Sequence, residues 1–119
     1  MIPKILLFGD SITQRSFGDL FFLESNSDGA SKVSPPCYGW GSLLSAIFQR
    51  RCDVVSRGLS GFTTRMARGV VEQVCSRDSV GECVRLVTVW FGANDAALEG
   101  VSPQHISVEE YGVNLAEVS

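Results

Sequence analysis

Ile5-Leu6-Leu7-Phe8-Gly9-Asp10-Ser11 is the stretch that decides the fold. A short apolar run that ends at a glycine is typical of a buried strand leading into a tight loop. The residues that follow, Ile12-Thr13-Gln14, resemble the start of a helix. Open α/β sheets place their ligand crevices at the carboxyl ends of the strands. Ser11 therefore lies where a nucleophile is useful, although a serine at this position could also serve only as a helix N-cap.

Strands and helices alternate along the rest of the chain. The sequence predicts strands at Lys4–Phe8, 53–56 and Val84–Phe91, and the last of these is a continuous apolar run that suits a central parallel strand covered on both faces. It predicts helices at Trp40–Arg50, after a cap at Thr63 or Thr64, and after Ser107, where Ser107-Val108-Glu109-Glu110 has the pattern of a capping box. This order predicts an α/β fold with a parallel sheet and right-handed crossovers.

Apolar stripes predict which side of each helix faces the core. The helix at Trp40–Arg50 carries Leu43, Leu44, Ile47 and Phe48, and the last helix carries Val108, Tyr111 and Leu115. The stretch 17–37 has no such period and is rich in Ser, Asn, Asp and Gly. It predicts a loop insertion, either a functional lid or a disordered segment, with the composition favouring disorder.

Composition and charge exclude several classes of function. The chain has 119 residues, enough for at most one small domain, and a formal net charge of −3 without a basic patch, so no nucleic-acid partner is expected. No stretch has the length of a membrane span or the form of a signal peptide, which predicts a cytoplasmic location. The four cysteines form no C-x-x-C pair, so we expect reduced packing residues and no zinc site.

Three glycine-containing loops each follow a predicted strand: Gly9-Asp10-Ser11, Arg57–Gly61 and Gly92-Ala93-Asn94-Asp95. In a parallel sheet these loops converge on one edge. Acyl transfer needs a nucleophile and donors for the oxyanion that forms on attack. Ser11 can supply the hydroxyl and its own N–H, Gly61 a second N–H, and Asn94 a side-chain NH₂. Asn94 could also act only as a loop-stabilising residue.

The three loops, in this order, resemble the SGNH hydrolases, or GDSL-like lipases and esterases. Val89–Ala97, followed by Gln104-His105-Ile106 and Glu109-Glu110-Tyr111, resembles the isoamyl acetate-hydrolysing esterase branch. The resemblance implies a flavodoxin-like α/β/α sheet, of which about three strands are present here. It also implies hydrolysis of small, acetyl-type carboxylic esters without a cofactor.

The same resemblance implies a role for particular residues. Ser11 is the nucleophile, and Ser11, Gly61 and Asn94 form the oxyanion hole. Asp10, Gly92 and Asp95 have supporting roles: Asp10 is expected to bond loop N–H groups, and Asp95 to anchor its loop rather than act as a base.

The chain departs from the family pattern in its catalytic base. The family's D-x-x-H block is absent, and the one histidine, His105, has Ser102 three positions before it. His105 is either a substitute base, oriented by Glu99 or Glu109, or a solvent-facing residue ahead of the Ser107 cap. Ser56 also replaces a common supporting asparagine, which predicts weaker loop anchoring.

These departures predict that residues 1–119 are the N-terminal part of one SGNH domain, truncated before its base. Two functions follow as alternatives: an ester hydrolase, or an inactive form that keeps the binding edge and acts as a binding or regulatory variant. A nucleotide-binding role is disfavoured because the chain has no glycine-rich phosphate fingerprint. The unpaired edges of an incomplete sheet would favour association and low stability.

Overall fold

β1 (Lys4–Gly9) is the middle strand of a three-stranded parallel sheet in the order β4-β1-β5. This computed structural model describes residues 2–18, 22–25, 31–34, 38–76 and 80–119. β4 (Asp53–Gly58) pairs with β1 on one side and β5 (Val84–Trp90) on the other. The apolar residues of β1 from Ile5 to Phe8 are all buried, as their sequence predicts for a central parallel strand.

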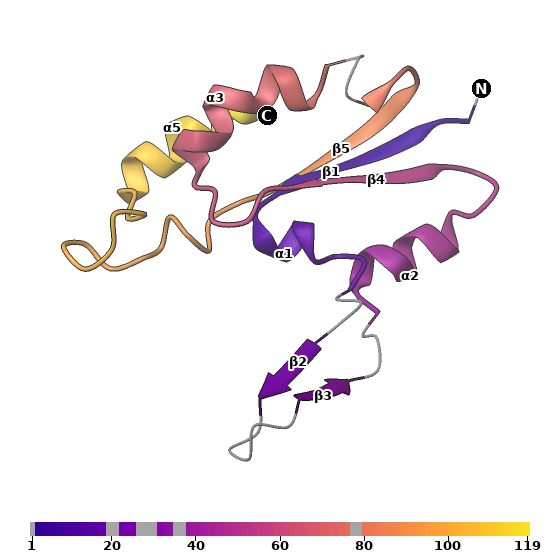
Figure 1. Cartoon of the computed structure of the whole chain (residues 1–119). Coiled ribbons are helices and arrows are strands. Elements are labelled where there is room, and N and C mark those ends of the chain that lie inside the picture. The colour runs from indigo at the N-terminus through magenta and orange to yellow at the C-terminus, as the bar shows by residue number, and fades with distance from the viewer. Residues whose placement is uncertain (1, 19–21, 26–30, 35–37, 77–79) are drawn as a thin grey trace.

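Helices lie on both faces of the sheet (Figure 1). α3 (Thr64–Val74) and α5 (Val108–Val118) lie side by side on one face, while α1 (Ser11–Gln14) and α2 (Trp40–Ile47) lie on the other. The main apolar cluster is on the α3 and α5 side, where the rings of Phe8 and Phe91 meet edge to face with centroids 4.9 Å apart. The expected incomplete α/β/α architecture is confirmed.

β5 differs from the prediction of a central, covered strand. Among the described residues only β1 pairs with it, and Leu86 and Trp90 are 53% and 51% exposed. The prediction was wrong for this chain because burial of β5 requires neighbours on its outer side. An apolar run shows that the side chains of a strand favour burial. It does not show whether this chain contains the neighbouring strands and helices that would bury them.

The predicted helical stripes are only partly correct. On α2, Leu44 and Phe48 are half-buried, but Leu43 and Ile47 are exposed, because the helix contacts the sheet along one narrow side. On α5, Val108 is 82% exposed because it is the first helical residue and lies at the rim of the fold. The fully buried polar residue on α5 is Asn114, which the apolar pattern did not indicate.

The predicted loop insertion at 17–37 contains a short hairpin. β2 (Phe22–Ser25) pairs antiparallel with β3 (Ser31–Ser34), with Phe22 opposite Ser34. The hairpin projects away from the sheet and helices (Figure 1), and the Cα radius of gyration is 16.9 Å, above the ~13–14 Å typical of a compact chain of this length. The remaining residues of the insertion, 19–21, 26–30 and 35–37, lie outside the described residues.

The cysteines and the lengths of the helices bear on two further predictions. Of the cysteines expected to pack inside, Cys52 and Cys83 are half-buried, Cys75 is exposed, and Cys37 lies outside the described residues. In the described parts of the chain, no helix has the length and apolar character needed to cross a bilayer.

Candidate active site

The Gly9-Asp10-Ser11 turn begins α1 at the carboxyl end of β1. Asp10 is the N-cap of this helix: it is fully buried, and its Oδ1 accepts a hydrogen bond from the Ile12 N–H at 2.9 Å. Asp10, which was expected to bond loop N–H groups, thus caps the first turn of α1. Ser11 is the first helical residue and is half-buried, so its side chain is not the helix cap that the sequence allowed.

Strand register brings the three glycine loops to one edge. Gly9 is opposite Gly58 on β4 and opposite Trp90 on β5. Two hydrogen bonds join the turns themselves: the Leu59 N–H donates to the Gly9 carbonyl at 2.8 Å, and the Asp10 N–H donates to the Trp90 carbonyl at 3.4 Å. The convergence expected from a parallel sheet is thus present in the backbone.

Asn94 links its loop to the glycine loop. Its Nδ2 donates to the carbonyl of Phe62, the residue after Gly61, at 2.9 Å. Gly61 has φ +79°, and its own carbonyl accepts from Gln104 Nε2 at 2.9 Å. An amide NH₂ has two hydrogens. Asn94 can therefore hold the glycine loop with one and donate to another acceptor with the second.

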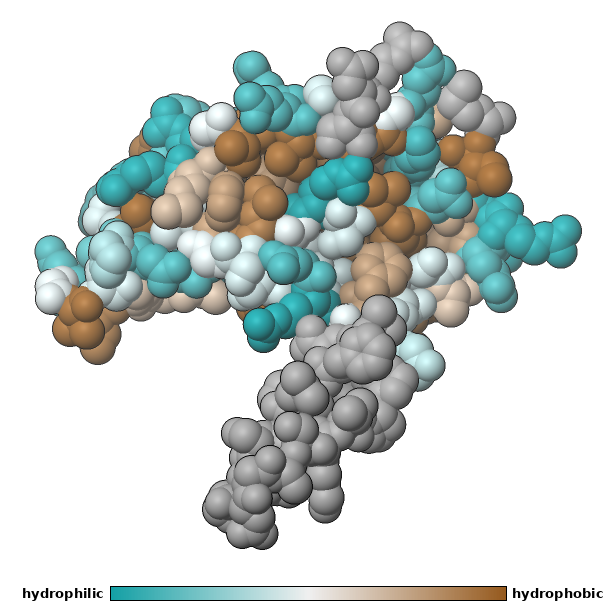
Figure 2. Space-filling model, in the orientation of Figure 1, coloured by the Kyte–Doolittle hydropathy of each residue, from teal (hydrophilic) through white to brown (hydrophobic). Residues whose placement is uncertain are grey.

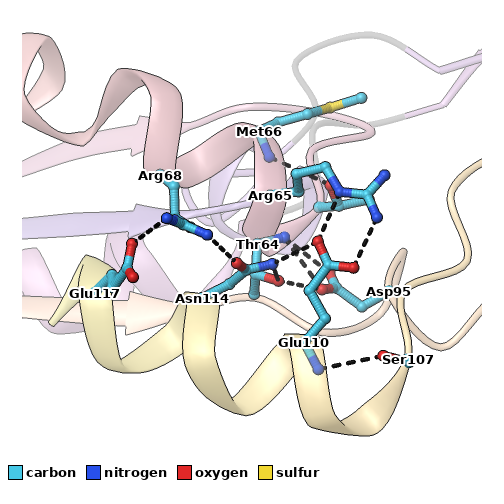
Figure 3. Close-up of polar contacts among 10 residues, drawn as sticks. Thr64, Arg65, Met66, Arg68, Asp95, Ser107, Glu110, Asn114 and Glu117 are labelled. Carbon is cyan, nitrogen blue, oxygen red and sulfur yellow. Dashed lines mark hydrogen bonds and ion pairs between the residues drawn. The ribbon is translucent and has the colours of Figure 1, made fainter.

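Asp95 anchors the start of α3. It is 3% exposed, and its carboxylate accepts from the Thr64 N–H at 3.0 Å and from the Thr64 hydroxyl at 2.5 Å (Figure 3). These contacts join the Asp95 loop to the start of α3. Thr64 and Asn114 complete this cluster. The sequence predicts Thr64 only as a possible helix cap and does not single out Asn114. The only signal was a polar residue, Asn114, on the inner side of the last predicted helix.

An ion pair on the surface links α3 to α5 beside this cluster. The Arg65 guanidinium makes two hydrogen bonds to the Glu110 carboxylate, both at 2.7 Å (Figure 3). These bonds lower the pKa of Glu110 to about 2 and raise that of Arg65. Glu110 is the last residue of the predicted capping box. Ser107 Oγ does accept from the Glu110 N–H at 3.2 Å, but the carboxylate turns toward Arg65.

His105 is not the solvent-facing residue that one of the two alternatives expected. It is half-buried, and its Nδ1 lies 2.7 Å from the carbonyl of Ala97. A carbonyl only accepts, so Nδ1 carries the proton. The position that an orienting Glu99 or Glu109 would take is thus held by the backbone of its own loop. Ser56, in contrast, still anchors its strand, since its hydroxyl donates to the Thr13 carbonyl at 3.1 Å.

A mostly apolar pocket of about 240 Å³ lies between the β5–α5 loop and α5, lined by Gly92, Asp95, Ala96, Ile106, Val108 and Tyr111. Gly92 and Asp95 belong to the third glycine loop, whereas neither Ser11 nor Gly61 lines the pocket. In the same loop, Leu98 and Val101 are exposed. Figure 2 shows hydrophobic surface at the lower left, where the loop between β5 and α5 projects in Figure 1. In the part of the chain that the structure describes, no three acidic, cysteine or histidine side chains are grouped to hold a metal ion.

The sheet order, the helices on both faces and the three joined turns define a protein of the α/β/α class with a parallel sheet. More specifically, the model of the GDSL-like lipase/acylhydrolase family matches residues 7–118, and the chain belongs to this family.

Similar proteins agree with this assignment. The chain is 39% identical over 117 residues to the isoamyl acetate-hydrolyzing esterase 1 homolog of Mus musculus, covering 98% of the chain and 40% of that protein. It is 43% identical over 122 residues to a GDSL esterase/lipase of Arabidopsis thaliana, covering 99% of the chain and 43% of that protein.

Among solved structures, the acetyl xylan esterase of Geobacillus stearothermophilus is similar with a TM-score of 0.60 and 25% identity, over 98% of this chain and 52% of that one. That enzyme has also been solved as catalytic mutants in which a histidine or an aspartate is replaced by alanine. The present chain thus spans about 40% of the length of the esterase homolog that it matches.

Proposed function

We propose that this chain carries the nucleophile and oxyanion hole of an ester hydrolase acting on small, acetyl-type carboxylic esters. The single observation that carries the proposal is the register that places Gly9, Gly58 and Trp90 side by side. Because of it, Ser11, Gly61 and Asn94 follow three adjacent strand ends. Family membership and the names of the relatives, which are esterases, support the same class of reaction.

In the proposed reaction Ser11 Oγ attacks the ester carbonyl carbon and loses its proton to a base. The negative charge on the carbonyl oxygen is held by the N–H groups of Ser11 and Gly61 and by the Asn94 amide. Loss of one such donor typically raises the barrier by about 3–4 kcal/mol. The C–O bond to the alcohol then breaks, the alcohol takes up the proton, and water hydrolyses the acyl-serine to release the acid.

The base is proposed to belong to an aspartate–histidine pair outside residues 1–119. The bond from His105 Nδ1 to Ala97 leaves Nε2 as the basic nitrogen, but within the described residues no hydrogen bond joins His105 to Ser11. The catalytic mutants of the acetyl xylan esterase replace an aspartate and a histidine, in agreement with a base of this kind in the family. Asp10, Gly92 and Asp95 support the loops.

The absence of a D-x-x-H block from residues 1–119 favours a second candidate. Without a base, a serine hydroxyl is a weak nucleophile. The 119-residue chain by itself could therefore bind small esters at the loop edge without turnover, as a binding or regulatory form.

A fluorophosphonate serine probe and a short-chain aryl ester separate the two candidates. The variants are Ser11→Ala and, as a matched control, Ser60→Ala, which removes an exposed hydroxyl from the glycine loop. If the 119-residue chain is itself a hydrolase, it shows stoichiometric labelling and ester turnover, both lost in Ser11→Ala and retained in Ser60→Ala. Labelling absent from the wild-type chain supports the second candidate for this polypeptide, whereas labelling retained in Ser11→Ala would overturn Ser11 as the nucleophile.

A further inference from the structure

A buried chain of hydrogen bonds runs from α5 through the start of α3 to the Gly92–Asp95 loop (Figure 3). Asn114 Nδ2 donates to Thr64 Oγ1 at 3.2 Å, and Thr64 Oγ1 donates to Asp95 Oδ2 at 2.5 Å. Asn114 and Thr64 are fully buried and Asp95 is nearly so. Three polar residues in such surroundings must satisfy one another, since burial without partners costs free energy.

The donor and the acceptor of each hydrogen bond in this series follow from the contact between Arg68 and Asn114. Arg68 donates to Asn114 at 2.9 Å, and a guanidinium has no acceptor, so the atom facing it is the amide oxygen. The amide NH₂ therefore faces Thr64, and the Thr64 hydroxyl accepts from it. That leaves the hydroxyl proton for Asp95. The carboxylate then receives two hydrogens from Thr64, one from the hydroxyl and one from the backbone N–H.

This cluster ties together the two loops that carry the proposed oxyanion donors. Thr64 begins α3 three positions after Gly61, and Asp95 is next to Asn94. A second tie, from Asn94 Nδ2 to the Phe62 carbonyl, spans the same gap. The Asp95–Thr64 and Asn94–Phe62 hydrogen bonds together join the loop of Gly61 to the loop of Asn94.

We propose that Asp95 and Asn114 are positioning residues that hold the Gly61 N–H and the Asn94 amide at a fixed separation. Asp95 acts directly on the start of α3, and Asn114 acts through the direction of the Thr64 hydroxyl. The inference rests on the oxyanion role proposed above. We call the Asp95–Thr64–Asn114 contacts the clamp. Misplacing catalytic donors by about 1 Å can lower a rate by about a hundredfold, so the loss of these contacts should lower the rate of ester hydrolysis.

The test is an exchange of the two side chains. Asp95→Asn places an amide NH₂ against the Thr64 hydroxyl, which already accepts from the Asn114 NH₂, so the hydroxyl proton loses its acceptor. Asn114→Asp places a second carboxylate on one hydroxyl that has one proton. In Asp95→Asn/Asn114→Asp, the new carboxylate accepts from Arg68 and from the hydroxyl, while the new amide donates to the hydroxyl and accepts from the Thr64 N–H. The double variant also retains the formal net charge of −3.

The readouts are amide hydrogen exchange at Gly61 and Phe62, the side-chain amide resonances of Asn94, and hydrolysis of a short-chain aryl ester. We expect each single variant to shift the Asn94 resonances, speed exchange about tenfold or more, and lower kcat with little change in KM. The double variant is expected to recover much of each loss. Recovery is incomplete because Glu110 lies 3.4 Å from the Asn114 amide nitrogen and would face the new carboxylate. Glu109→Gln, an exposed change on the same helix, should alter none of these readouts.

The proposal would be overturned if the double variant lost as much exchange protection and kcat as the two single variants together, or more. It would also be overturned by single variants that leave the Asn94 and Gly61 signals unchanged. If a single variant does not fold, a folded double variant with Asn94 resonances like those of the wild type supports the clamp. An unfolded double variant counts against it. The resonance and exchange data decide the clamp even when no ester is hydrolysed, whereas Ser11 labelling separately decides the proposed function.

Discussion

Gly92 shows how one residue can limit the geometry of the loop that carries Asn94. Its φ of +138° is a conformation that residues with a side chain rarely adopt, and a Cβ there would lie 3.3 Å from the Tyr111 hydroxyl. That hydroxyl donates to the Phe91 carbonyl at 3.1 Å. The positive φ of Gly92 and its close contact with Tyr111 both favour a glycine at this position, two residues after the end of β5.

Gly92→Ala is expected to destabilise the fold by about 1–3 kcal/mol, through backbone strain and displacement of Tyr111. Urea unfolding followed by circular dichroism measures the change. Gly112→Ala is the matched control: it lies within α5, and nothing lies within 4 Å of its added Cβ. It should stabilise the chain by about 0.5–1 kcal/mol. Equal effects of the two changes would contradict this account of Gly92.

At the scale of the elements, α3 and α5 are held together by polar contacts as well as by apolar packing. Arg65 and Arg68 on α3 pair with Glu110 and Glu117 on α5, and Asn114 lies buried between them. The sequence predicted both helices and the Ser107 cap. It did not predict these partners, because Arg65 and Glu110 are 45 positions apart and meet only when both helices pack on the same face of the sheet.

Acid should weaken the contact between these helices through Glu110. Its pKa in the folded chain is lowered to about 2 from an ordinary value of 4.5, chiefly by hydrogen bonding to Arg65. The folded state thus binds fewer protons than the unfolded state in this interval. The stabilisation is present above about pH 4.5 and is lost as the pH falls toward about 2.

Thermal unfolding of the wild type and of Glu110→Gln, followed between about pH 6 and about pH 3, measures this effect. We expect the wild type to be the more stable protein at the higher pH, with the difference shrinking as the pH falls. Glu109→Gln should not show this convergence. A difference between wild type and Glu110→Gln that stays constant with pH would refute the role assigned to the ion pair.

At the scale of the whole molecule, the outer side of β5 is the most unusual feature. The strand has seven residues, Val84–Trp90, and within the described residues it lacks a partner beyond β1. Long, apolar edge strands promote association, and natural proteins usually protect them with charges or cover. Because the chain spans about 40% of the length of the esterase homolog, we expect its isolated form to be marginally stable and prone to associate.

Leu86→Lys should reduce this association, since it places a charge at an exposed apolar position of β5. Sedimentation velocity over a range of concentrations measures the shift toward monomer. Val113→Lys is the control, because Val113 is similarly exposed but lies on α5. If both variants dissociate to the same degree, or neither does, association does not run through β5. A cooperative unfolding transition with a high midpoint would contradict the expected low stability.

The elements and the candidate chemistry could be predicted from the sequence because they depend on local features. The run Ile5–Phe8, the glycines that end the strands and the Thr63 and Ser107 caps all act within a few residues. They led to the parallel sheet, the order of elements and the three loops with Ser11, Gly61 and Asn94. The short hairpin inside 17–37 was missed because its strands have no clear apolar period.

Contacts between distant segments were decided only by the tertiary structure. Asp95 and Thr64 are 31 positions apart, and Asn114 and Thr64 are 50 apart, so no local pattern shows that they bond. The exposure of β5, of Leu43 and of Val108 likewise depends on how the elements pack and not on the local sequence. The sequence by itself determined which groups could do chemistry. The crossing of α3 and α5 over the sheet determined which side chains hold them, because a buried polar group takes whichever partner the packing brings within hydrogen-bond distance.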